Sequence, residues 1–92
     1  MPIAARLGTG EIAELLAIER HDQLALVSPR SFAPGAPFSM DVDLAPDRTL
    51  VVSCKVIAIK RREDGRFDVR GRAVALRRAD REAIAVALSV AT

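Results

Sequence analysis

Four residues with reactive side chains stand together at positions 19–22, where the sequence reads Glu-Arg-His-Asp. Their histidine, His21, is the only one in the chain, and an imidazole beside carboxylates is an arrangement that general acid–base catalysis uses. No serine or cysteine nucleophile is visibly paired with it. Apolar runs flank the four residues on both sides, which is typical of an exposed turn between strands. We therefore predict no catalytic residue here and no enzymatic activity.

The other reactive side chains are scattered along the chain. A metal site needs several converging His, Cys, Asp or Glu ligands, and one histidine and one cysteine on different elements do not supply them. We predict neither a metal nor a cofactor. Cys54, between Val52 and Val56, is expected to be a buried small hydrophobe. Asp41 and Asp43 share one face of a predicted strand, and we expect that face to be solvated.

Composition limits the classes of function. The 92 residues suffice for one domain with one modest core. Half of them are hydrophobic, but there is no Trp or Tyr and only three Phe, so the core must be aliphatic. Proteins that bind single-stranded nucleic acid usually stack bases on aromatic side chains. This chain offers little material for such stacking, so nucleic acid is not the partner we expect.

The charge distribution supports the same conclusion. The formal net charge is +2, whereas nucleic-acid binders more often show a basic stripe. Basic residues gather between Lys60 and Arg72, but acidic residues such as Asp64 and Asp68 dilute them. We expect a solvated polar face there. A small nucleic-acid-binding barrel that uses the segment Lys60–Arg72 is kept as an alternative.

The sequence also predicts where the protein acts. The N-terminal stretch MPIAARLGTG is too short and insufficiently apolar for a signal peptide. No apolar run is long enough to span a membrane. The lone Cys54 forms no intramolecular disulfide and fits a reducing compartment. We therefore expect a cytoplasmic protein.

Short, regularly spaced turn signals predict a small β domain that positions these residues. Residues 1–10 are expected to form an arm or a short first strand. Residues 11–20 fit a helical stripe as well as a strand, and the β pattern around them favours a strand. Leu24–Ser28 is predicted to be a short strand, and the prolines that follow predict a loop.

The clearest predicted strand is PFSMDVDL, in which alternate residues from Phe38 to Leu44 face the core. A turn is expected at Pro46 and Asp47. The β-branched run Thr49–Lys60 then predicts a central strand, or one that crosses a barrel corner.

A hairpin follows, because Asp64 and Gly65 tolerate the positive φ angles of a tight turn. The return strand is predicted over Phe67–Leu76, with Gly71 marking a bulge or bend. The residue pattern then changes to helical spacing, which predicts a helix over 78–91.

These elements predict a mainly β fold. We expect a small antiparallel β-barrel of about six strands over residues 11–76, followed by the C-terminal α-helix. The whole chain, 1–92, is interpreted as a single domain.

This order of elements resembles the PilZ domain family over roughly residues 10–90. The stretch FAPGAPFSMDVDL looks like the family's Pro-Gly loop leading into an alternating strand. VVSCKVIAIKRREDGRFDVRGRAVAL looks like its long hairpin, and RRADREAIAVAL resembles its terminal helix. The resemblance implies a small β-barrel with a C-terminal helix.

The resembled family binds the bacterial messenger cyclic di-GMP through two motifs, R-x-x-x-R and [D/N]-x-S-x-x-G. Arginines pair with phosphates and stack on guanine, while small residues let the backbone approach the ligand. Arg6 is the only arginine before Arg20, so the first motif is missing. Glu19, His21 and Leu24 stand where the second motif should be, and none of them is the expected residue.

The resemblance therefore implies a degenerate member of the family. We expect a regulatory or adaptor domain that binds another bacterial protein in signalling or motility, without cyclic di-GMP. An apolar helix face or an edge strand could also support a homodimer. The alternative is a cyclic di-GMP receptor that uses Arg6, Arg20 and Arg30 in place of the motifs.

A candidate interaction surface comprises Arg30, Phe32, Arg70 and Arg72. Phe32 lies in the proline-rich loop PRSFAPGAP. The favoured interpretation is that Phe32 folds back to plug the barrel end. Otherwise its ring anchors a partner, with Arg30 supplying a polar contact.

Overall fold

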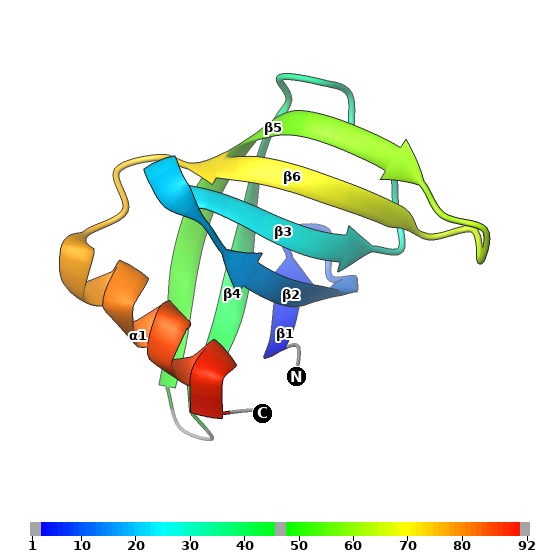
Figure 1. The fold of residues 1–92 in the computed structure, drawn as a ribbon. Coiled ribbons are helices and arrows are strands. Elements are labelled where there is room, and N and C mark those ends of the chain that lie inside the picture. Colours follow the sequence, from blue (N-terminus) through cyan, green and yellow to red (C-terminus); the bar gives the residue numbers. More distant parts are fainter. Residues whose placement is uncertain (1–2, 46–47, 91–92) are drawn as a thin grey trace.

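Six antiparallel strands close into a barrel in the order β1-β2-β3-β6-β5-β4, and one helix follows the last strand. The computed structural model describes residues 3–45 and 48–90. The elements in chain order are β1 (Ile3–Leu7), β2 (Ile12–Ile18), the short 3₁₀ turn η1 (Arg20–Asp22), β3 (Gln23–Ser28), β4 (Pro37–Ala45), β5 (Arg48–Arg61), β6 (Phe67–Ala73) and α1 (Arg78–Val90). Figure 1 shows this arrangement. The expected fold class, a six-stranded antiparallel barrel with a C-terminal helix, is confirmed.

The N-terminal residues contribute a strand of the barrel. β1 pairs with both β2 and β4, so it closes the cylinder. Of the two interpretations of residues 1–10, the short strand therefore describes Ile3–Leu7. The barrel begins there, ahead of the expected residue 11, because Ala5 and Leu7 alternate into the core.

Within residues 11–20, Ile12–Ile18 form the strand β2, as the flanking β pattern favoured, and Arg20 already belongs to η1. Ala13 and Leu15 are buried, whereas Ile12 and Leu16 are exposed. This period of two fits a pleated strand with one buried face. Apolar residues on the outer face made the sequence look equally helical.

The predicted alternation in β4 is confirmed. Met40 and Val42 are buried, and Phe38 and Leu44 are half-buried against the same core. The run after it forms the longest strand, β5, which pairs with β4 through its first half and with β6 through its second half. β5 therefore passes from one side of the barrel to the other, as the corner-crossing interpretation predicted.

The return strand differs from the prediction in two ways. It ends at Ala73, short of the expected Leu76, because Ala75 adopts a positive φ of 56° that breaks the extended conformation. Gly71 carries no bulge. The register shift lies on the opposite strand, between Val56 and Ala58 of β5.

Gly71 has a different role, which is to make room for an aromatic ring. A Cβ at this position would lie 3.2 Å from two ring carbons of Phe38. A side chain here would push the Phe38 ring away by a few tenths of an ångström, so the absence of a Cβ lets the ring lie close against β6.

The helix α1 packs against β2 and β4, as Figure 1 shows at the lower left. Ile84 is fully buried and Leu88 is half-buried, so the predicted apolar stripe faces the core. Residues 1–2, the turn residues Pro46 and Asp47, and the last expected helical residue, Ala91, lie outside the described residues. No helix in the described part of the chain has the length and apolar character needed to cross a bilayer.

Candidate functional site

The connection between β2 and β3 is a tight turn, as the sequence predicted for the four polar residues. His21 and Asp22 have φ angles of 60° and 57°, in the left-handed region. The backbone N–H of Glu19 donates a 2.7 Å hydrogen bond to the carbonyl of Gln23, which closes the turn. His21 is exposed, and no nucleophile contacts it among the described residues.

Two ion pairs tie this turn to the rest of the molecule. Arg70 Nη1 of β6 lies 3.0 Å from Glu19 Oε1, and Arg81 Nε of α1 lies 3.0 Å from Asp22 Oδ1. Arg81 Nη2 also donates a 2.7 Å hydrogen bond to the carbonyl oxygen of Glu19. The carboxylates of the turn therefore neutralise two of the arginines beside it.

An open pocket of about 570 Å³ lies over the turn. Guanidinium groups from three different elements reach it, which suits an anionic group better than a neutral one. Its lining residues are Ile18, Glu19, Arg20, His21, Gln23, Arg70 and Arg81.

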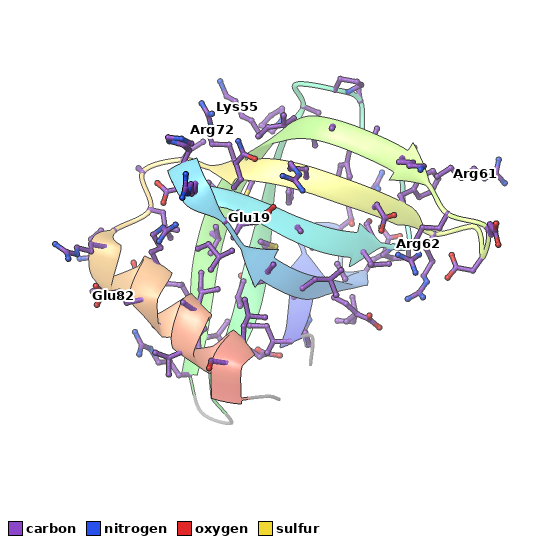
Figure 2. The ribbon with its side chains drawn as sticks, viewed as in Figure 1. Glu19, Lys55, Arg61, Arg62, Arg72 and Glu82 are labelled. Carbon is purple, nitrogen blue, oxygen red and sulfur yellow. The ribbon has the colours of Figure 1, made fainter. Side chains whose placement is uncertain are left out.

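A row of side chains extends from this pocket across the outer face of the sheet. Gln23 of β3 stands opposite Arg72 of β6, and Arg72 stands opposite Lys55 of β5. In Figure 2, Lys55 and Arg72 lie near each other and point away from the barrel. We call Arg20, Lys55, Arg70 and Arg72 the basic strip. Within the described residues, Arg70 alone of these four has a carboxylate partner, Glu19.

A second pocket, of about 480 Å³, borders the strip at Lys55. It is largely apolar, and Val74 on its wall is 50% exposed. Its lining residues are Pro37, Phe38, Ser39, Ser53, Cys54, Lys55 and Val74. An apolar hollow beside cations that have no ion pair among the described residues combines two kinds of contact that a protein partner uses.

Cys54 lies under this second pocket and is a packing residue. Its side chain is buried, and burial raises the pKa of its thiol to about 12. The thiol is therefore protonated at neutral pH, and a protonated thiol is a poor nucleophile. This agrees with the expected role as a small hydrophobe.

The loop between β3 and β4 folds back on the barrel. The rings of Phe32 and Phe38 stack with centroids 5.0 Å apart, and the Arg30 guanidinium lies 5.6 Å above the Phe32 ring. Arg30 Nη1 also lies 3.4 Å from Glu11 Oε1. Phe32 packs on the core, which agrees with the favoured interpretation, so its ring is not a free anchor for a partner.

The residues of the predicted interaction surface fall in two places. Arg70 and Arg72 project from the outer face of β6, whereas Arg30 and Phe32 belong to the loop. No hydrogen bond or ion pair links the two pairs in the part of the chain that the structure describes.

The three arginines of the alternative ligand site are also separated. Arg20 lines the pocket over the turn, but Arg6 lies opposite Ile12, at the other end of β2. β2 is 7 residues long, which separates its ends by about 20 Å. Arg30 contacts Glu11 near the Arg6 end. These arginines therefore do not surround one pocket.

At the tip of the β5–β6 hairpin, residues 60–68, two arginines pair with carboxylates, whereas Lys60 and Arg61 have no ion pair among the described residues. Arg62 Nη1 lies 2.7 Å from Asp68 Oδ1, and Arg66 Nη2 lies 2.9 Å from Asp64 Oδ2. Hydrogen bonds from the backbone and side chain of Arg66 lower the pKa of Asp64. A hydrogen bond to Asp68 raises the pKa of Arg62. The hairpin tip is thus a solvated polar face, as the sequence predicted, on which Arg62 and Arg66 are neutralised by carboxylates.

Lys55 is the residue that sequence reasoning missed. Counting back from the Asp64-Gly65 turn in a regular hairpin puts Val56 opposite Arg72. The extra residue at Ile57 shifts the register by one, so Lys55 takes that place instead. The only available signal was a lysine in an otherwise apolar strand.

Comparison of the chain with known protein families, with curated proteins and with solved structures found no match. Within residues 3–45 and 48–90, no group of three or more His, Cys, Asp or Glu side chains is placed to hold a metal ion. The functional argument therefore rests on the surface chemistry described above.

Proposed function

We propose that this chain is a PilZ-like regulatory domain that acts in bacterial signalling or motility by binding another protein, without cyclic di-GMP. The order of elements is the first support. The second is the β2–β3 turn, where the resembled family keeps a ligand motif. The conclusion depends above all on the charges of that turn.

The main support for the absence of cyclic di-GMP binding is the pair of carboxylates at this turn. Glu19 and Asp22 each lie 3.0 Å from an arginine that a phosphate would need. A phosphate group that approached Arg70 or Arg81 would have to displace a carboxylate and then face its negative charge. Leu24, at the place of the motif's glycine, is a core residue with 0% exposure and offers no backbone opening.

Calorimetric titration with cyclic di-GMP tests this proposal. We expect no binding in the micromolar range, at low or at physiological salt. A Glu19→Gln variant is titrated in parallel, because it removes one negative charge of the turn and keeps the size of the side chain. Micromolar or tighter binding by the unmodified chain would overturn the proposal.

A receptor for cyclic di-GMP is the second candidate, and the pocket over η1 favours it. Three arginines line that pocket, and Arg20 has no ion pair among the described residues. This candidate predicts a salt-sensitive affinity that Arg20→Ala removes and that Arg61→Ala, at the hairpin tip, leaves intact. Absence of binding at any salt concentration would eliminate it.

A further inference from the structure

We infer that the basic strip, together with the pocket beside Lys55, docks an acidic peptide segment that carries an apolar anchor residue. This inference rests on the proposed function, because it names the surface and the kind of partner through which the adaptor would act. Three features of the structure support it.

The first is the unfavourable charge arrangement in the strip. Lys55 and Arg72 face each other on antiparallel strands, where directly opposite like charges are destabilising. Neither has an ion pair among the described residues. Four residue pairs further along the same hairpin, Lys60 faces Asp68, so β5 and β6 pair opposite charges elsewhere. Among the described residues, Lys55 and Arg72 present their positive charges to solvent without a carboxylate partner, and a carboxylate-bearing partner would relieve their repulsion.

The second is the β-bulge that creates this arrangement. The register shifts between Val56 and Ala58, and this shift turns Val56 inward and brings Lys55 opposite Arg72. Bulges are commonly used to re-aim side chains next to functional sites. The bulge therefore both buries an apolar side chain and assembles the cationic pair.

The third is the apolar pocket that borders the pair. Val74 is half exposed, and the pocket wall that it shares with Lys55 is mainly apolar. A partner with acidic residues alone would leave this surface in water. A peptide with one apolar side chain among its carboxylates would cover it and gain from burial.

A peptide fits this surface better than a nucleic acid. Single-stranded nucleic acids gain much of their affinity from bases stacked on aromatic rings. Phe32 and Phe38 stack on each other, and Phe67 is half-buried against the core. Phe38 is the one aromatic residue that lines either pocket in the described part of the molecule, and its half-buried ring is already stacked on Phe32. The strip thus supplies positive charge and an apolar hollow without a base-stacking platform.

Fluorescence anisotropy with three labelled probes tests the inference. The first probe is a synthetic peptide of alternating Asp and Glu with one central Leu. The second replaces every Asp and Glu by Asn and Gln, and the third is a single-stranded DNA of equal charge. We expect the acidic peptide to bind, its affinity to fall as salt rises, and the neutral peptide not to bind. Binding of the DNA more tightly than the acidic peptide would overturn the assignment of partner.

Charge-matched variants locate the site. Lys55→Gln with Arg72→Gln removes two charges from the strip, and we expect it to weaken peptide binding by about tenfold. Lys60→Gln with Arg61→Gln removes two charges from the hairpin tip, and we expect less than about a twofold change. Equal losses in both variants would mean attraction by net charge alone, and would contradict a docking site.

Val74→Ser probes the apolar contact separately, because it removes apolar surface beside Lys55 without adding a charge, and we expect it to weaken binding of the same peptide. Thermal unfolding of each variant confirms that it is folded. Unchanged affinity in this variant would remove the anchor from the proposal.

Cyclic di-GMP added to the same chain separates this inference from the proposed function. If the dinucleotide binds, the proposed function fails whatever the peptide does. If neither the dinucleotide nor the acidic peptide binds, the docking site fails while the absence of cyclic di-GMP binding still holds.

Discussion

The two ends of the β5–β6 hairpin are rich in basic residues but differ in how those charges are balanced. At the tip, Arg62 and Arg66 lie within 2.9 Å of carboxylates from Asp68 and Asp64. At the other end, which we call the root, Lys55 and Arg72 face each other without a carboxylate partner among the described residues. The same hairpin therefore carries two neutralised arginines near its tip and, at its root, two opposed cations without a carboxylate partner among the described residues.

This difference in charge pairing shows that the fold does not need every basic residue of the hairpin to have a carboxylate partner. Exposed ion pairs such as those at the tip each contribute little to stability, because solvent screens them. The root forgoes even that contribution and accepts repulsion between opposed cations. A surface charge that opposes folding is the kind of feature that binding explains, which is why we assign the partner surface to the root.

The largest effect is expected from the core beneath the root. Leu24 stands opposite Gly71 and is fully buried. Leu24→Ala should lower the free energy of unfolding by about 2–5 kcal/mol, through lost burial and the cavity that remains. Urea denaturation measures this. Leu16→Ala on the exposed face of β2 is the matched control, and a similar loss there would contradict the placement of Leu24 in the core.

The next effect concerns the residue between Arg70 and Arg72. Gly71→Ala brings a Cβ to 3.2 Å from the ring of Phe38, so the ring must move. We expect a loss of about 1–3 kcal/mol in the free energy of unfolding, which is typical of overpacking. Phe38→Leu in the same chain should reduce the penalty of Gly71→Ala. Additive losses in the double variant would show that the two residues do not conflict.

Two charge reversals with a smaller expected effect on the free energy of unfolding test the contrast between root and tip. Lys55→Glu places opposite charges across the root, and should raise the free energy of unfolding by about 0.2–1 kcal/mol. Asp68→Lys places like charges opposite Lys60 at the tip and also removes the ion pair with Arg62, so it should lower the free energy of unfolding by at least a similar amount. Both are read from urea denaturation at low salt. Shifts of the same sign in the two variants would contradict the contrast between the ends.

The smallest effect is a pH dependence confined to the tip. The pKa of Asp64 is lowered from 3.8, chiefly by the backbone hydrogen bond from Arg66 and then by its side chain. Its stabilising contribution is therefore present above the ordinary pKa and is lost as pH falls through the lowered one. Asp64→Asn should remove part of the acid dependence of unfolding. An unchanged pH profile would show that this carboxylate contributes nothing to folding.

Much of the fold could be predicted from the sequence. Phe38–Leu44 alternates clearly between apolar and polar residues, and the Asp64-Gly65 turn and the spacing of α1 are strong local signals. Residues 11–20 were ambiguous because Ile12 and Leu16 are apolar but exposed. These residues form a strand because β2 pairs with β1 and β3, and the local residue pattern carries no information about that pairing.

The candidate site was only partly predictable. Arg70 and Arg72 were singled out, but Arg30 and Phe32 were grouped with them because loop and strand cannot be placed relative to each other from sequence. Lys55 was missed because one bulge changes which residues face each other across two strands. A register shift of this kind leaves no distinct mark in the residue types.

The affinity of the Lys55→Glu variant for the acidic peptide tests the central claim most directly. The change reverses one charge at the root and, by the argument above, does not weaken the fold. We expect binding of the peptide to fall by more than about tenfold in an anisotropy titration at low salt. An affinity equal to that of the unmodified chain would contradict the assignment of the root as the docking surface.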